Sequence, residues 1–143
     1  MNKRDNIILA CAALFVVGAA VVLLRVTLSG EAGSAGPLIE HVSGYNFDDT
    51  VLKSELPVLV DFWAEWCPAC RKLTPIITDI ASETEGMVKV VKVNVDEARP
   101  LAERYNIRVL PTLIIFKYGT EMERTVGFLP RDSILALLKK YAS

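Results

Sequence analysis

The chain divides into three parts by the pattern of its apolar and polar positions. Residues 7–24 form an unbroken uncharged run of 18 residues. As a helix this run would span roughly 27 Å at about 1.5 Å per residue, close to the ~30 Å core of a bilayer. Residues 29–37 are rich in Gly, Ala and Ser, a composition typical of a flexible linker. We therefore expect a membrane anchor over residues 1–28, a linker over 29–37 and one folded domain over 38–143.

From residue 38 onward, the spacing of apolar residues predicts alternating strands and helices. Alternating or continuous β-branched runs predict strands at 38–42, 58–63, 87–95, 112–117 and 121–128. Apolar residues at helical spacing predict helices at 45–54, 67–83, 98–105 and 131–141. This order is typical of an α/β domain, and the continuous apolar run at 58–63 is typical of a strand buried within a parallel sheet.

The composition limits the classes of function. Acidic and basic residues nearly balance, at 17 and 16, and give a net charge of −1, so we expect no nucleic-acid partner. The chain has three cysteines, Cys11, Cys67 and Cys70, and one histidine, His41. These are too few for a disulfide scaffold, and too few outside the predicted anchor for a tetrahedral zinc site within one chain. We expect a monomer without a metal or cofactor.

The charges beside the apolar run predict its orientation in the membrane. Lys3 and Arg4 precede the run, and Arg25 alone follows it, which favours an N-terminus inside the cell. The folded domain is then expected outside the cytoplasm, anchored to the cytoplasmic (inner) membrane by a single span and facing the periplasm or an equivalent space. The small residues at 34–36 leave open cleavage by a signal peptidase, although they lie well past the apolar run.

The strongest chemical signal is a pair of cysteines, Cys67 and Cys70, shortly after the predicted strand at 58–63. The pair falls at the expected start of a helix, with Pro68 in the first turn, where its missing N–H costs no hydrogen bond. The first sulfur then lies near unpaired backbone N–H groups and the positive end of the helix dipole. This environment favours the thiolate, the nucleophilic form of cysteine.

The residues around this pair resemble the thioredoxin family. The stretch Val-Asp-Phe-Trp-Ala-Glu-Trp-Cys-x-x-Cys at 60–70 has the family pattern in full. Further pieces follow at the family's spacing: Val-Lys-Val-Asn-Val-Asp at 91–96, Val-Leu-Pro-Thr at 109–112, Phe-Lys-Tyr-Gly at 116–119 and Val-Gly at 126–127. The resemblance covers about residues 38–143 and implies the thioredoxin fold, a central mixed sheet flanked by helices. Between its cysteines the chain has Pro68-Ala69, where typical thioredoxins have Gly-Pro.

Four residues are expected to carry the chemistry. Cys67 would attack a substrate disulfide to form a mixed disulfide, and Cys70 would resolve it by closing a Cys67–Cys70 disulfide. Asp61 lies in an otherwise apolar strand, where burial should raise its pKa and make it a proton acceptor for Cys70. The resemblance implies that Lys92 reaches Asp61 from the neighbouring strand, whereas the residue pattern alone fits a solvated lysine equally well.

The resemblance also implies a surface that binds substrate. A cis peptide bond before Pro111 would face the disulfide, and Leu110 would pair its backbone with an extended substrate segment. Trp66 is expected to form an apolar rim, Trp63 to pack in the core beneath it, and Gly127 to allow a close approach of substrate backbone. The expected substrate-binding residues are Trp66, Pro68, Ala69, Leu110, Pro111 and Gly127.

We therefore expect a membrane-anchored thiol–disulfide oxidoreductase that reduces disulfides of extracytoplasmic proteins. Its electrons would come from a thiol-transfer partner in the membrane. One alternative is a disulfide oxidase or isomerase, because proline directly after the first cysteine occurs in oxidising relatives and the compartment favours disulfides. Another is a metal-handling or docking module that uses the two cysteines as ligands.

Overall fold

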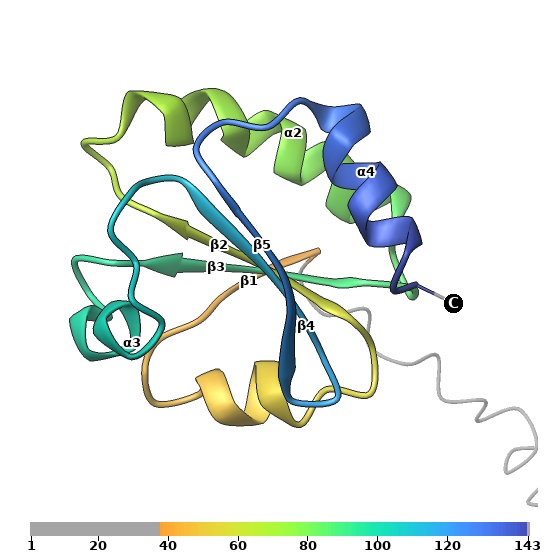
Figure 1. The fold of residues 1–143 in the computed structure, drawn as a ribbon, viewed down its shortest axis with the longest axis horizontal. Coiled ribbons are helices and arrows are strands. Elements are labelled where there is room, and N and C mark those ends of the chain that lie inside the picture. The colour runs from red at the N-terminus through yellow and green to blue at the C-terminus, as the bar shows by residue number, and fades with distance from the viewer. Residues whose placement is uncertain (1–37, 143) are drawn as a thin grey trace, which may run out of the picture. The chain divides into compact units, whose positions relative to one another are not determined.

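The computed structural model describes residues 38–142, which form one α/β domain (Figure 1). The predicted anchor at 1–28 and the linker at 29–37 lie outside the described residues. Between residues 38 and 142, no helix combines the length and the apolar character that a membrane crossing requires.

Strands and helices follow each other in the predicted order. The elements are β1 (Ile39–His41), η1 (Asp48–Leu52), β2 (Val58–Trp63), α2 (Pro68–Glu83), β3 (Lys89–Asn94), α3 (Arg99–Arg104), β4 (Thr112–Lys117), β5 (Thr120–Val126) and α4 (Arg131–Lys139). The strand predicted at 58–63 has the predicted bounds, because its apolar run ends where the chain must turn toward the cysteines. The first helix is shorter than predicted and is a π-helical turn.

The five strands form one sheet in the order β1-β3-β2-β4-β5. β1, β3 and β2 run parallel, whereas β4 and β5 are antiparallel to their neighbours. The mixed sheet implied by the resemblance is confirmed. β2 lies at the centre, and its pairing with β3 places Asp61 directly opposite Lys92.

Side chains alternate between the two faces of the sheet, so each face has its own core. On one face, strand residues such as Leu59 and Val90 pack against α2 and α4. On the other face, Val60 and Phe62 pack with residues from η1 and α3, and Figure 1 shows the helices on opposite sides of the sheet. Asp61 lies two residues from Leu59 and therefore faces α2, the helix that begins at the cysteine pair.

A two-residue turn joins β4 to β5. Tyr118 and Gly119 have φ angles of 53° and 74°, which is the positive-φ conformation that tight hairpin turns require. Because the turn closes there, β5 begins at Thr120 rather than at the predicted residue 121. A Cβ at Gly119 would lie 3.0 Å from the carbonyl oxygen of Leu52. Glycine therefore allows both the turn and its packing against the end of η1.

Substituting three glycines separates these two effects. We expect Gly119→Ala to lower the free energy of unfolding by about 2 kcal/mol, since it adds backbone strain and a contact with Leu52. Gly86 has a φ of 77° but open space around its Cβ position, so Gly86→Ala should cost about 1 kcal/mol. Gly44 has neither feature, and Gly44→Ala should be nearly neutral. Urea unfolding measures all three, and equal losses for Gly86→Ala and Gly119→Ala would rule out the contact.

Candidate active site

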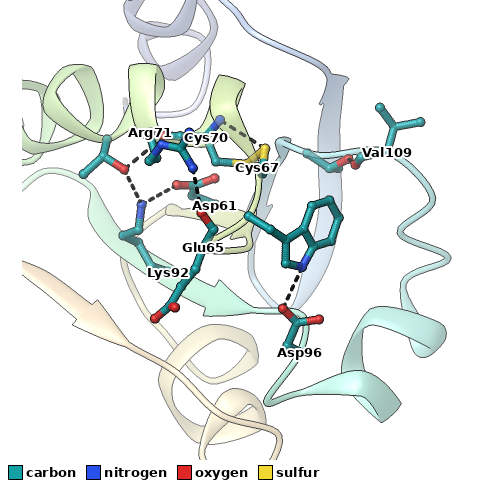
Figure 2. The surroundings of a disulfide bond; sticks show 11 residues. Asp61, Glu65, Cys67, Cys70, Arg71, Lys92, Asp96 and Val109 are labelled. Atoms are coloured by element: carbon teal, nitrogen blue, oxygen red, sulfur yellow. Dashed lines mark hydrogen bonds and ion pairs between the residues drawn. A yellow bond between two sulfur atoms is a disulfide. The ribbon is translucent and has the colours of Figure 1, made fainter.

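The two cysteines lie where the central strand passes into α2. After β2, a turn is closed by the Cys67 N–H, which donates to the Ala64 carbonyl at 3.2 Å. Cys67 is then the N-cap of α2, and Pro68 occupies the first turn. Cys67 and Cys70 form a disulfide with a Cα–Cα distance of 5.3 Å, shown in Figure 2. The predicted pairing and the predicted helix start are both confirmed.

The two sulfurs have different surroundings. The Cys70 backbone N–H donates to the Cys67 Sγ at 3.1 Å, so the helix start offers a hydrogen bond to the first sulfur. No acidic residue lies in the first turn of α2, and the helix dipole is therefore unopposed there. Cys70 is fully buried, whereas Cys67 retains 4% of its surface. A partner sulfur can thus reach the pair only from the side of Cys67.

A buried ion pair lies beneath the disulfide. The Lys92 Nζ donates to the Asp61 Oδ2 at 2.8 Å, and the two side chains are 5% and 0% exposed. Burial raises the pKa of Asp61 above its ordinary value, and the positive charge of Lys92 only partly opposes this. The contact implied by the resemblance is therefore present, and Asp61 does not face water at the strand end.

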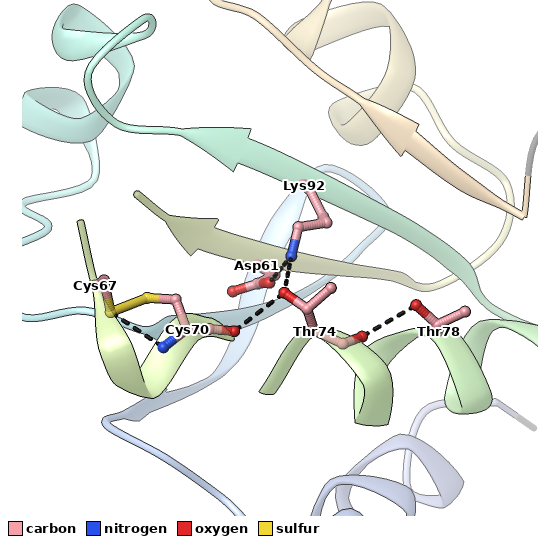
Figure 3. A network of polar contacts seen from close by, with 6 residues as sticks. All are labelled: Asp61, Cys67, Cys70, Thr74, Thr78 and Lys92. Carbon is pink, nitrogen blue, oxygen red and sulfur yellow. Dashed lines mark hydrogen bonds and ion pairs between the residues drawn. A yellow bond between two sulfur atoms is a disulfide. The ribbon is translucent and has the colours of Figure 1, made fainter. Parts of the chain in front are cut away.

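The second oxygen of Asp61 is free to act as a base. Its Oδ1 is buried and has no hydrogen-bond partner within residues 38–142. Figures 2 and 3 both show this oxygen on the side of the carboxylate toward the disulfide. A buried acceptor without a partner costs free energy, and here the missing partner can be supplied by a thiol proton during the reaction.

Thr74 joins the ion pair to the helix that carries the cysteines. The Lys92 Nζ also donates to the Thr74 Oγ1 at 3.3 Å, and this hydroxyl donates to the Cys70 carbonyl at 3.1 Å (Figure 3). No pattern in the sequence singles out Thr74. Its position four residues after Cys70 placed it on the same helix face, but only the packing of α2 on the sheet shows that it meets Lys92.

Two further polar contacts hold the turn beside Cys67. The exposed indole of Trp66 donates from Nε1 to the Asp96 Oδ2 at 2.9 Å. Arg71, in the first turn of α2, donates from one guanidinium nitrogen to the Glu65 carbonyl at 2.9 Å (Figure 2). The sequence does not predict the roles of Asp96 and Arg71. The spacing of exposed charged residues does not indicate that one contacts the Trp66 ring and the other the Glu65 carbonyl.

The segment before β4 lies on the other side of the cysteines. The Leu110–Pro111 peptide bond is cis, as the resemblance implies, and Leu110 packs against the cluster formed by Ala64 and the two cysteines. Outside the strands and helices of residues 38–142, no backbone hydrogen bond involves Leu110. Its main chain is therefore free to pair with another segment.

Gly127 lies beside this proline. Its N–H donates to the Pro111 carbonyl at 2.8 Å, and its φ of 87° requires glycine. A Cβ at Gly127 would meet no atom within 4 Å, so the space in front of it is open. Ala69 also packs against the cysteine cluster, and Pro68 is exposed. The structure thus brings all six expected substrate-binding residues to the surroundings of the disulfide.

Trp63 packs against the core beneath Trp66, as expected, but it is not fully enclosed there. It contacts the cysteine cluster but is only partly buried, and it lines a pocket of about 240 Å³ with His41 and Lys92. Its ring lies 4.9 Å from the Lys92 Nζ and meets the His41 ring edge-on at 6.5 Å. Trp63 ends β2 on the same face of the sheet as Asp61, and its Nε1 is buried with no hydrogen-bond partner within residues 38–142.

Metal binding has little support in the described domain. From residue 38 to 142, no three His, Cys, Asp or Glu side chains come together closely enough to hold a metal ion. The two cysteines would need further ligands from outside residues 38–142 to complete a site.

The raised pKa of Asp61 predicts a specific dependence of stability on pH. An unfolded Asp loses its proton near pH 4, whereas the folded group keeps it to higher pH. Rising pH therefore favours the unfolded state until the folded group also ionises. We expect Asp61→Asn to gain stability relative to the wild type as the pH rises above about 4.

Urea unfolding at several pH values measures this difference. Losing the partner of Lys92 adds a cost to Asp61→Asn, so the test is how the difference between the two proteins changes with pH, not its size at one pH. The control is Asp79→Asn, which changes an exposed carboxylate on α2. A difference between Asp61→Asn and wild type that does not change with pH would contradict the burial argument.

Comparison with known proteins gives a consistent result. Residues 38–140 match the family model described as Thioredoxin. The thioredoxin of Synechocystis sp. is 49% identical over 101 residues, covering 71% of this chain and 94% of that protein. The thioredoxin of Rickettsia bellii is 46% identical over 98 residues, covering 68% and 93%. The chloroplastic M-type thioredoxin of Spinacia oleracea is 39% identical over 113 residues, covering 79% and 62%.

These similarities span the whole described domain, including the helix start that carries the disulfide. The geometry of Cys67 and Cys70 and the match over residues 38–140 lead to the same conclusion. The chain belongs to the thioredoxin family and is a thioredoxin-type thiol–disulfide oxidoreductase.

Proposed function

We propose that this protein reduces disulfides in proteins outside the cytoplasm, with Cys67 as the attacking and Cys70 as the resolving cysteine. The observation that carries the proposal is the free Oδ1 of a buried Asp61 on the disulfide side of the carboxylate. A carboxylate with a raised pKa is suited to accept a proton from a thiol near neutral pH. This base would serve the half-reaction in which the reduced dithiol gives up its electrons.

In the first step, the thiolate of Cys67 attacks one sulfur of the substrate disulfide. A bond forms between Cys67 and that sulfur, the substrate bond breaks, and the other substrate sulfur leaves as a thiolate that takes a proton from water. The Cys70 N–H, which points at the Cys67 Sγ, and the N-terminus of α2 stabilise the attacking thiolate. Cys67 performs this step because it alone reaches the surface.

In the second step, Cys70 resolves the mixed disulfide. Asp61 accepts the proton of the Cys70 thiol, and the resulting thiolate attacks the Cys67 Sγ. The Cys67–Cys70 bond forms, the bond to the substrate breaks, and the second substrate thiolate leaves with the electron pair. The dithiol is oxidised by two electrons and the substrate disulfide is reduced by two. Lys92 holds Asp61 in place from β3.

The substrate would lie between Trp66 on one side and the cis-Pro111 segment on the other. The free backbone of Leu110 offers hydrogen bonds to an extended peptide, in the manner of an added strand. Open space in front of Gly127 leaves room for the substrate's main chain. Pro68 and Ala69 would form the floor of this surface, beside the disulfide.

The compartment follows from the sequence outside the described domain. The uncharged run at 7–24, with Lys3 and Arg4 before it, supports a single-pass anchor in the inner membrane and a periplasmic domain. A reductase in that space requires electrons from the cytoplasm. Its electron donor would be a membrane protein that carries electrons across the bilayer by thiol–disulfide exchange.

The reduction potential tests the direction of the reaction. We expect equilibrium with glutathione to give a value nearer to about −270 mV, typical of thioredoxin, than to about −120 mV, typical of a strong oxidant. The proline after Cys67 motivates the comparison, and a matched variant, Pro68→Gly with Ala69→Pro, restores the usual Gly-Pro pair. A potential near the strong oxidants would support the oxidase alternative and overturn the reductase proposal.

Trapping tests the order of the cysteines and the compartment. We expect Cys70→Ser to accumulate mixed disulfides with extracytoplasmic proteins in cells, because the resolving thiol is missing. With Cys11→Ser in both proteins, the matched variant Cys67→Ser should trap few partners, since its remaining thiol, Cys70, is fully buried. Partners are identified by mass spectrometry after non-reducing purification. Partners drawn only from the cytoplasm would contradict the proposed location.

A further inference from the structure

The side chain of Thr74 occupies a place between the ion pair and the resolving cysteine. Its hydroxyl accepts from the Lys92 Nζ and donates to the Cys70 carbonyl. A hydroxyl has one hydrogen to donate and can accept as well, so both contacts are compatible. Thr78, one turn later on α2, makes the same kind of bond to the Thr74 carbonyl at 3.0 Å, but it is exposed and has no contact with Lys92. The contact with the ammonium group is therefore specific to Thr74 (Figure 3).

The ammonium group of Lys92 has three N–H donors, and within residues 38–142 three groups lie against it. These are the Asp61 Oδ2 at 2.8 Å, the Thr74 Oγ1 at 3.3 Å and the ring of Trp63 at 4.9 Å. Lys92 is 5% exposed, so water supplies little of its solvation. A buried ammonium is costly unless it is paired and hydrogen-bonded.

The reaction changes one of these neighbours. When Asp61 takes up a proton, it loses the negative charge that faces Lys92. Thr74 and Trp63 are then the remaining groups that stabilise the positive charge. Thr74 is the only hydroxyl among the three, and its bond to the Cys70 carbonyl holds it on α2.

We propose that Thr74 is a positioning residue for the resolving step: its hydroxyl holds the charged Lys92 in place while Asp61 carries the proton of Cys70. The proposal rests on the proposed role of Asp61 as the base. It adds that Asp61 is an effective base because Lys92 has a second hydrogen-bond acceptor, the Thr74 hydroxyl. Without Thr74, protonated Asp61 would leave Lys92 poorly solvated, so Asp61 would give up its proton more readily and would be a weaker base.

The bonds and electrons in this step are those of the second half-reaction. The Cys70 thiol gives its proton to Asp61, and its sulfur forms the bond to the Cys67 Sγ. The bond between Cys67 and the substrate sulfur breaks, and that sulfur leaves as a thiolate with the electron pair. Asp61 later releases the proton to water. Thr74 exchanges no proton and only retains its hydrogen bonds.

Other charged groups near the ion pair are few. On the neighbouring strand β1, His41 is the register partner of Lys92, and Glu65 and Glu97 line the same pocket as Lys92. On β4, the register partner of Asp61 is the apolar Leu113. On α2, the titratable group near Asp61 is Cys70. His41 and the two glutamates are exposed or partly exposed and are common to all the variants compared, so they do not distinguish Thr74 from Thr78.

The test uses the full chain in detergent, with Cys11→Ser in every variant so that Cys67 and Cys70 are its two thiols. Thr74→Val removes the hydroxyl and keeps the branched shape. Thr74→Ser keeps the hydroxyl, and Thr78→Val removes the matching hydroxyl one turn away. Reduced protein is mixed in a stopped-flow instrument with excess 5,5′-dithiobis(2-nitrobenzoate). The first release of thionitrobenzoate, which depends on reagent concentration, reports attack by Cys67. The second, which does not, reports resolution by Cys70.

We expect Thr74→Val to slow the second release by roughly threefold to tenfold at pH 7, since it removes one hydrogen bond to a charged group. The first release should not change. The difference should shrink as the pH rises, because hydroxide can then remove the thiol proton without a base. In the oxidised protein, the carboxyl of Asp61, followed by ¹³C NMR, should titrate at lower pH in Thr74→Val. Thr74→Ser and Thr78→Val should both behave as the wild type.

Several results would overturn the proposal. Equal second releases and equal Asp61 titrations in Thr74→Val and Thr78→Val would remove the special role of Thr74. Failure of Thr74→Ser to restore the rate would show that shape, not the hydroxyl, matters. If Thr74→Val does not fold, Thr74→Ala is measured in the same way and judged by the same outcomes.

Asp61→Asn separates this proposal from the one on which it rests. If Asp61→Asn resolves as fast as the wild type, Asp61 is not the base, and both proposals fall. If Asp61→Asn is slow while Thr74→Val equals Thr78→Val, the base remains supported and only the role of Thr74 is overturned.

Discussion

A carboxylate and an ammonium group meet inside this domain, on the face of the sheet that α2 covers, and both are nearly removed from water. Desolvating two charges costs several kcal/mol per ion, so a pair of this kind rarely adds net stability. Breaking it would nevertheless leave one buried charge without a partner. The parallel register of β2 and β3 and the position of α2 are thus both constrained by the contact between Asp61 and Lys92.

The same helix that covers the ion pair also presents the disulfide. Cys67 caps α2, Cys70 lies one turn inside, and Thr74 lies one turn further, against Lys92. A single rigid element therefore places the nucleophile at the surface, the resolving thiol in the interior and a hydroxyl on the ammonium group. The asymmetry between the two cysteines follows directly from their positions on this helix, since only the first reaches solvent.

The walls around the disulfide come from segments far apart in the chain. The turn before Cys67 is held by Arg71 at the Glu65 carbonyl, and the Trp66 ring is held by Asp96. Across from them, the Gly127 N–H donates to the Pro111 carbonyl. Each wall has a backbone or ring fixed by a hydrogen bond, so the surface offered to a substrate is formed before the substrate arrives, which lowers the entropy lost on binding.

The local features of the site were determined by the sequence alone. The apolar run at 58–63 predicted β2 with its bounds, and the cysteine pair with Pro68 predicted the helix start, because these depend on neighbours along the chain. The family resemblance supplied the contact of Lys92 and the cis bond. Only the tertiary structure decided that Thr74 meets Lys92, that Asp96 meets Trp66 and that Trp63 lines a pocket as well as packing on the core. Those contacts join residues that are far apart in the chain. They depend on how the helices and loops pack on the sheet, and no pattern of neighbouring residues encodes that packing.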